Sequence, residues 1–268
     1  MGHRSCKGHR TRSGRGKRVL SEEDRAAAEW ARMAGASLME LRSRSEPGKS
    51  LGQEGDRLSH RLLMGEIAAR FPDDRIRSEE ADQSEVLGAQ SGRVWIIDPL
   101  DGTREYSEGR EDWAVHVALA VDGAPVVGAV ALPALDVVLG TGQAPPLPAP
   151  APVPRMVVSR SRPPDFSSFV AEALAAATIP MGSAGAKIAA VIRGEAEVYV
   201  HAGGQYEWDS AAPVAVALAS GLHASRLDGS PLRYSQADPW LPDLVVCHPT
   251  LTDAVSEALS AFGVSAAG

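Results

Sequence analysis

The chain has 268 residues, 44% apolar and 23% charged, which is the composition of an ordinary soluble globular protein with a sizeable core. No apolar stretch approaches the roughly 20 residues of a membrane span, and none follows the basic N-terminus, so we expect a cytoplasmic protein with no membrane partner. Cys6 and Cys247 have no partners at metal-ligand spacing, which argues against a zinc site or a disulfide framework.

The net charge of −7 is unevenly distributed, because residues 1–18 contain seven lysines and arginines and no acidic residue. Clustered cations can displace counterions from nucleic acid, so one hypothesis is a nucleic-acid-binding protein that uses this tail. The other is a disordered extension. We favour the extension and regard a nucleic-acid partner as unlikely, since no aromatic residues lie between the charges.

Two helices precede the predicted strands. Ser21 and Asp24 form a capping-box pattern at the start of a helix expected from about residue 21 to 43. A second amphipathic helix carries apolar residues from Leu58 to Phe71, where Pro72 ends it. Between them, Gly48-Lys49-Ser50 lacks the first glycine of a phosphate-binding P-loop and is expected to be a loop.

Short β-rich runs follow and predict an antiparallel sheet of residues 94–98, 113–121, 125–132 and 135–139. Beyond them, predicted strands at 156–159, 196–200 and 243–247 alternate with helices near 165–177, 183–193 and 209–220. The fold class is therefore α/β, with an α+β first half and an α/β second half.

The two halves are separated by a proline- and alanine-rich stretch, which favours an extended linker. We predict a basic disordered tail (1–18), an α+β domain that binds metal and phosphate (19–142), the linker (143–155) and an α/β domain that lines the substrate pocket (156–268).

The most informative segment is WIIDPLDGTREY. An apolar strand runs into Asp98 and is ended by Pro99, so the Asp98 carboxylate is presented at the strand end. Asp101 follows three residues later, and one tight turn can direct both carboxylates and the Leu100 carbonyl at a common point. Such clustered oxygen atoms suit Mg²⁺. A plain surface turn is the alternative interpretation, because turns also prefer Asp, Pro and Gly.

Other residues could complete such a site. Gly102 and Thr103 open a possible helical turn, whose free backbone N–H groups attract phosphate. Glu79 and Glu80 lie upstream and could add ligands, or could be solvated loop acids. Asp209 begins a long helix, where it could reach across to the metal or simply cap the helix.

Together, WIIDPLDGTREY, the upstream SEE and the downstream EWDSAAP resemble the inositol monophosphatase superfamily of Mg²⁺-dependent, lithium-sensitive phosphatases, over about residues 21 to 262. The residues Arg104-Glu105-Tyr106 after DPLDGT, and the EWD form, are more similar to its 3′-phosphoadenosine 5′-phosphate phosphatase branch than to its inositol branch. The resemblance implies a layered α/β/α/β/α fold and a homodimer.

By matching motifs, the resemblance implies that two or three Mg²⁺ ions, with Li⁺ inhibitory, are held by Glu79, Asp98, Leu100 (through its carbonyl), Asp101 and Asp209. The implied substrate-binding residues are Leu100, Asp101, Gly102, Thr103, Ser183, Lys187 and Asp209. Thr103 and Glu79 would be catalytic, positioning and deprotonating the attacking water.

Three points stay open at this stage. The family's usual acidic stretch before the second helix is replaced here by Gly55-Asp56-Arg57, and Asp56 could substitute for its acid. Lys187 could instead be an exposed helix residue. Among the histidines, we expect His116 to be a satisfied core residue, while His201 and His223 show no partner in the sequence.

The resemblance implies the function of a 3′(2′),5′-bisphosphate nucleotidase of sulfate assimilation, which hydrolyses the 3′-phosphate of 3′-phosphoadenosine 5′-phosphate to give AMP. Inositol 1-phosphate and fructose 1,6-bisphosphate are alternative substrates, because a metal site recognises mainly the phosphate.

Overall fold

The computed structural model describes residues 20–81 and 91–263. The basic tail lies outside these residues, so its role stays a prediction. A first five-stranded sheet has the order β1-β2-β3-β4-β5 and contains β1 (Arg75–Ser78), β2 (Arg93–Asp101), β3 (Ala114–Val121), β4 (Ala124–Leu132) and β5 (Val137–Gly140). A second has the order β7-β6-β8-β10-β9 and contains β6 (Arg155–Ser159), β7 (Ala177–Met181), β8 (Val198–Tyr206), β9 (His223–Ser225) and β10 (Trp240–Cys247).

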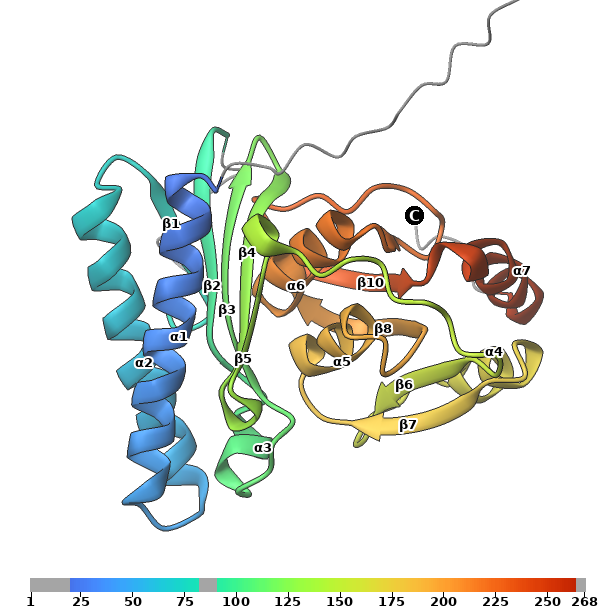
Figure 1. The fold of residues 1–268 in the computed structure, drawn as a ribbon, viewed down its shortest axis with the longest axis horizontal. Coiled ribbons are helices and arrows are strands. Elements are labelled where there is room, and N and C mark those ends of the chain that lie inside the picture. Colours follow the sequence, from blue (N-terminus) through green and yellow to red (C-terminus); the bar gives the residue numbers. More distant parts are fainter. Residues whose placement is uncertain (1–19, 82–90, 264–268) are drawn as a thin grey trace, which may run out of the picture.

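Helices cover both faces of each sheet, which gives five layers (Figure 1). The outer layer on the first sheet is formed by α1 (Glu22–Ser43) and α2 (Lys49–Arg70), and the layer between the sheets by α5 (Ala184–Ile192) and α6 (Glu207–Ser220). The second sheet is covered on its other face by α4 (Ser167–Ala173) and α7 (Thr252–Phe262). The predicted layered α/β/α/β/α arrangement is confirmed.

Shorter elements connect these layers. A one-turn helix, α3 (Thr103–Ser107), follows β2, and three 3₁₀ turns span η2 (Pro133–Leu135), η3 (Thr141–Gln143) and η4 (Pro249–Leu251). Within the part of the chain that the structure describes, no helix combines the length and apolar character needed to cross a membrane.

The predicted capping box at the start of α1 is confirmed. The Asp24 N–H donates to Ser21 Oγ at 3.0 Å, and the Ser21 N–H donates to the Asp24 carboxylate at 3.2 Å. Both groups would otherwise be unpaired donors at a helix end.

The start of α2 corrects the sequence analysis. The helix begins at Lys49, so the expected loop at Gly48-Lys49-Ser50 is wrong, and the start expected at Leu58 is nine residues late. The early turns pack through glycines: a Cβ atom at Gly52 would lie 2.7 Å from Thr103 Cγ2 of α3. A close contact made by glycine leaves no apolar periodicity in the sequence, which explains the error.

The first sheet is antiparallel from β2 to β5, as predicted. The short strand β1 joins its edge in parallel, with Arg77 opposite Ile96 of β2. Because β1 and β2 run parallel, their carboxyl ends lie at the same end of the sheet. That end carries Glu79 and Asp98.

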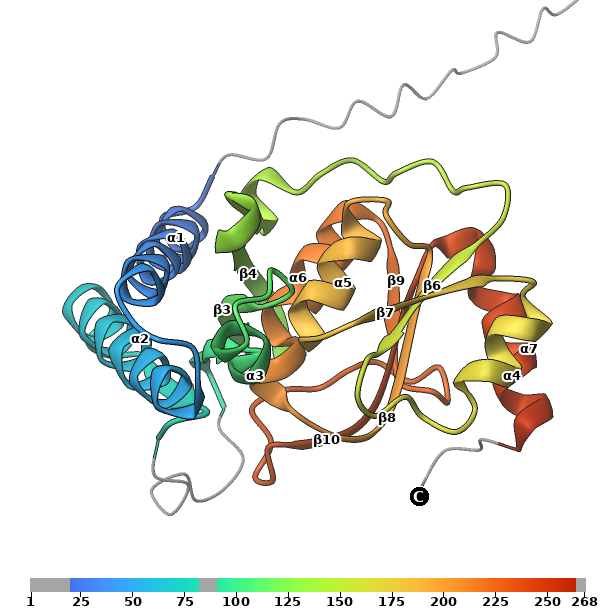
Figure 2. The same cartoon turned by 90° about the horizontal axis from the view of Figure 1, so that it is seen from below.

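The middle layer of helices lies between the two sheets (Figure 2). It shares one hydrophobic cluster with both of them. Ile96 of β2 and Val157 of β6 belong to this cluster, together with Ile188 of α5 and Val214 of α6. Residues 144–154 form no helix or strand, in agreement with their composition. The division into two domains stays a prediction.

Close packing of β4 on α6 gives a stability prediction. A Cβ atom at Gly128 would lie 2.8 Å from Ala215 Cβ and closer still to the Ala212 carbonyl oxygen. We expect Gly128→Ala to lower the free energy of unfolding by about 1–3 kcal/mol in urea denaturation, because the helix must move away. The control is Gly65→Ala on the exposed face of α2, where the added methyl group meets nothing. Equal stabilities of the two variants would contradict the prediction.

Candidate metal and phosphate site

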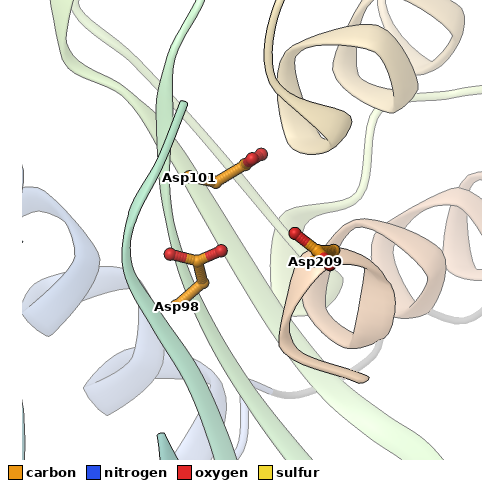
Figure 3. Close-up of side chains that lie close together, drawn as sticks. All are labelled: Asp98, Asp101 and Asp209. Carbon is orange, nitrogen blue, oxygen red and sulfur yellow. The ribbon is translucent and has the colours of Figure 1, made fainter. Parts of the chain in front are cut away.

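Three carboxylates meet where β2 ends opposite the first turn of α6 (Figure 3). Asp98 and Asp101 come from β2 and Asp209 comes from α6. One oxygen from each lies within 4.8 Å of the others, close enough for all three to contact one ion. The structure thus brings together three of the predicted ligands, including one that is more than 100 residues distant in sequence.

Local backbone geometry at the end of β2 directs Asp98 and Asp101. The pairing of β2 with β3 is irregular between these two residues, which is how a strand changes the direction of its side chains. The Leu100 N–H donates to the Asp98 carboxylate at 3.0 Å, and the Leu100 carbonyl accepts from Thr103 Oγ1 at 3.0 Å. A tight turn therefore holds two carboxylates and one carbonyl, as the sequence predicted.

Asp101 also holds the start of α5. Its carboxylate accepts hydrogen bonds from Ser183 Oγ at 2.5 Å, from the Ala184 N–H at 3.2 Å and from the Gly185 N–H at 2.5 Å. A negative charge at a helix N-terminus is stabilised by the unpaired N–H groups there. The helix can approach this closely because Gly185 has no Cβ atom, which would collide with His116 Nε2.

Asp209 caps its helix and also faces the other two carboxylates. Its carboxylate accepts from the Tyr206 N–H at 2.6 Å, which caps α6, and one of its oxygens also faces Asp98 and Asp101. The helix cap and the place in the cluster are compatible because a carboxylate has two oxygens with several lone-pair positions.

Glu79 stands beside this cluster rather than within the group of oxygens that are mutually close. Although Glu79 is exposed as a residue, the atoms packed around its carboxyl group and the charges of Asp209 and Asp56 raise its pKa to about 8, and a hydrogen bond with Asp98 partly opposes that rise. The dependence of its pKa on these neighbours places Glu79 in one electrostatic unit with the cluster.

Burial and mutual repulsion dominate the electrostatics of the site. Asp98 is 1% exposed, and burial, followed by the charges of Glu79 and Asp101, raises its pKa well above the usual value. Burial and the charge of Asp101 raise the pKa of Asp209 to about 7. Carboxylates gathered in this way favour either protons or a cation. Because every donor is oxygen, the set fits a hard divalent ion such as Mg²⁺.

Thr103 lies between the cluster and α2. Its hydroxyl is 3.3 Å from an Asp56 carboxylate oxygen and donates to the Leu100 carbonyl. Gly102 has φ of 87°, a conformation that favours glycine, and there the chain turns into α3. Asp56 is nearly buried, and burial raises its pKa to about 7, with the charge of Glu80 adding to the rise. The acid in α2 therefore contacts the predicted catalytic threonine.

A cavity of about 470 Å³ opens beside the carboxylates. Its lining includes Asp101, Gly102, Asp209, Ser183 and Lys187, all predicted from the sequence. The alternative of an exposed Lys187 is wrong: the residue is 5% exposed, and its Nζ donates to the Gly182 and Ser183 carbonyls at 3.2 and 2.5 Å. Burial lowers the pKa of Lys187. The lysine thus places its amino group in a wall of the cavity.

Three more residues of the cavity lining were not predicted, since the sequence analysis discounted His201 and did not consider the other two. They are Tyr199, His201 and Gln205 of β8. Gln205 donates to the Tyr199 hydroxyl at 3.0 Å, while neither ring nitrogen of His201 has a hydrogen-bond partner in the described residues. Burial and the charge of Lys187 lower the pKa of His201 to about 4. The alternation of Tyr199 and His201 along one strand face was the available signal.

His116 only partly fits the expectation of a satisfied core residue. It is fully buried, and one ring nitrogen, Nδ1, lies 2.9 Å from the Trp208 carbonyl. The other, Nε2, lies 3.4 Å from the Asp101 carboxylate. His116 therefore contacts the candidate ligand Asp101 and the residue before Asp209.

The raised pKa values give a pH prediction. The folded chain raises the pKa of three carboxyl groups, to about 7 for Asp56, 8 for Glu79 and 7 for Asp209. In the unfolded chain these pKa values lie near 4. At these three groups the folded metal-free protein binds more protons than the unfolded chain between about pH 4 and 8, so their contribution to the free energy of unfolding falls as pH rises. We expect calorimetry in EDTA to give a lower Tm at pH 8 than at pH 5, and Mg²⁺ to raise the Tm more at pH 8. A Tm independent of Mg²⁺ at pH 8 would contradict this.

Comparison with known proteins agrees with the geometry. The model of the "Inositol monophosphatase family" matches residues 19–260. A protein named 3′-phosphoadenosine 5′-phosphate phosphatase from Mycobacterium bovis is 51% identical over 223 residues, covering 78% of this chain and 83% of that protein. The protein of that name from Mycobacterium leprae is 47% identical over 244 residues, covering 83% and 88%.

Solved structures share the fold. The crystal structure of CysQ from Bacteroides thetaiotaomicron, described as a bacterial member of the inositol monophosphatase family, superimposes with a TM-score of 0.74 at 24% identity. The match covers 84% of this chain and 96% of that one.

Proposed function

The chain belongs to the inositol monophosphatase family, and from this premise we propose that it hydrolyses the 3′-phosphate of 3′-phosphoadenosine 5′-phosphate to give AMP and phosphate. The observation that carries the proposal is the similarity to the 3′-phosphoadenosine 5′-phosphate phosphatase from Mycobacterium bovis. The two sequences are 51% identical, and the match extends over most of both chains. The carboxylate cluster beside a cavity supplies a place for such a reaction. Removal of this nucleotide would serve sulfate assimilation in the cytoplasm, with a homodimer as the proposed assembly.

In this proposal the metal ligands are Glu79, Asp98, the Leu100 carbonyl, Asp101 and Asp209. Four carboxylates exceed what one Mg²⁺ usually takes from protein, so we propose two or three ions. Bound there, the ions would supply an acidified water and stabilise the charge that develops on the phosphate and the leaving oxygen.

The chain's own groups would orient the reactants. Thr103 Oγ1, which contacts Asp56 and the Leu100 carbonyl, would position the attacking water, and Glu79 would accept its proton. The backbone N–H groups of Gly102 and Thr103 would bind phosphate oxygens. Ser183 and Lys187 would line the side of the cavity that receives the departing nucleoside.

The first test is phosphate release from 3′-phosphoadenosine 5′-phosphate. We expect turnover with Mg²⁺, loss of turnover in EDTA and inhibition by Li⁺. For Asp98→Asn we expect kcat/KM to fall by at least about a hundredfold, because losing a residue that merely orients a metal ligand already lowers activity 10–100-fold. Lys49→Gln, at the exposed start of α2, serves as the control. Full activity of Asp98→Asn in Mg²⁺ would remove Asp98 from the site.

The cavity has a volume of about 470 Å³, which is large enough to admit leaving groups other than a nucleoside. Two further substrates are therefore compatible with its size. Inositol 1-phosphate and fructose 1,6-bisphosphate present the same phosphate group. We expect kcat/KM to be highest for 3′-phosphoadenosine 5′-phosphate in steady-state assays of all three. A preference for either competitor would replace the nucleotidase assignment but leave the metal site in place.

A further inference from the structure

One buried ion pair connects the two segments that bring Glu79 and Asp209 to the site. Arg77 lies two residues before Glu79, and Glu207 lies two residues before Asp209. Arg77 Nη1 and Glu207 Oε2 are 2.5 Å apart, and the two side chains are 0% and 1% exposed. The pair joins positions 130 residues apart in sequence, one in the first sheet and the other at the start of α6.

A third segment closes this arrangement. The second terminal nitrogen of Arg77 donates to the Gln236 carbonyl at 2.7 Å, and the Gln236 N–H donates to the other Glu207 oxygen at 2.8 Å. The Glu207 N–H donates to the Pro239 carbonyl at 2.9 Å. Both oxygens of the glutamate are therefore used, and the guanidinium binds two segments at once, an arrangement that fixes direction as well as distance.

Stability alone does not account for this pair. Removing two charges from water costs several kcal/mol for each ion, and apolar residues of similar volume often stabilise a protein as well or better. β1 has only four residues and pairs with β2 alone among the described strands, so its position relative to α6 is weakly set by the sheet. The ion pair supplies a direct connection between β1 and α6.

We propose that Arg77 and Glu207 are positioning residues, which set the distance between the Glu79 and Asp209 carboxylates across the metal site. The proposal rests on the metal site described under the proposed function. Mg²⁺ requires ligands in nearly octahedral geometry at 2.0–2.1 Å, so a small displacement of one segment weakens binding. Neither residue contacts the substrate in this scheme. Loss of the pair should therefore appear first as weaker metal affinity.

The test is the double variant Arg77→Met with Glu207→Gln, which removes both charges but keeps side-chain length and an acceptor for the Gln236 N–H. Mn²⁺ binding is followed by the EPR signal of the free ion, and folding by circular dichroism. We expect a folded protein whose Kd for Mn²⁺ is at least about tenfold higher, the size of effect known for groups that orient metal ligands. The Mg²⁺ concentration that gives half-maximal hydrolysis should rise by a similar factor.

The matched control is a second ion pair, which involves a strand of the second sheet that carries none of the candidate metal ligands. Arg226 and Asp243 form two hydrogen bonds of 2.7 and 2.8 Å between the second sheet and the segment after β9. Arg226→Met with Asp243→Asn should leave the Mn²⁺ affinity unchanged. An equal loss of affinity in both double variants would mean a general effect of destabilisation and would overturn the proposal.

Other outcomes are equally decisive. Wild-type Mn²⁺ affinity in a folded Arg77→Met/Glu207→Gln protein would overturn the positioning role. If that variant does not fold, Arg77→Lys, which keeps the charge but loses the planar two-segment contact, is expected to weaken Mn²⁺ binding about threefold or more, and unchanged binding would overturn the proposal. No divalent-ion binding by the wild type would remove the metal site and this inference together. Metal binding without hydrolysis of 3′-phosphoadenosine 5′-phosphate would remove only the substrate assignment.

Discussion

Repulsion among buried carboxylates is the interaction on which this site depends. Asp98 and Asp101 are buried and Asp209 is half-buried, and burial together with the neighbouring negative charges makes ionisation of Asp98 and Asp209 less favourable. Such a group of carboxylates destabilises the fold unless protons or a cation bind to it. The surrounding contacts work against that repulsion: the Leu100 N–H on Asp98, the start of α5 on Asp101, and the Tyr206 N–H on Asp209. These donors hold each carboxylate in place while one oxygen of each remains directed at the others.

The sequence predicted the parts of the site that are local. Asp98, Pro99 and Asp101 determine their own turn, and the capping box at Ser21 is likewise contained in four residues. The layered fold followed from the family resemblance, which the family match and the half-identical relatives confirm. The approach of Asp209 to β2 rested on the same resemblance, because no local pattern links segments so far apart in the chain.

What the sequence could not supply are contacts between distant segments that leave no periodic signal. The early start of α2 depends on glycines that fit against α3, and the Arg77–Glu207 pair joins two isolated charges from separate elements. From the sequence, both residues would be expected at the surface, because Arg and Glu side chains are usually exposed to solvent. His201 was discounted and Gln205 was not considered for a related reason, since only the folded sheet shows that they line the cavity.

The contact between Asp101 and the start of α5 has a consequence for how this enzyme can change over evolution. The same carboxylate belongs to the candidate metal cluster and anchors Ser183, whose side chain lines the cavity wall on the α5 side. Substitutions in that wall would therefore disturb the reaction centre as well as the choice of substrate. The wall formed by β8 has no such bond to Asp101, so new specificities in this lineage should arise through residues 199, 201 and 205, while the α5 side stays constant.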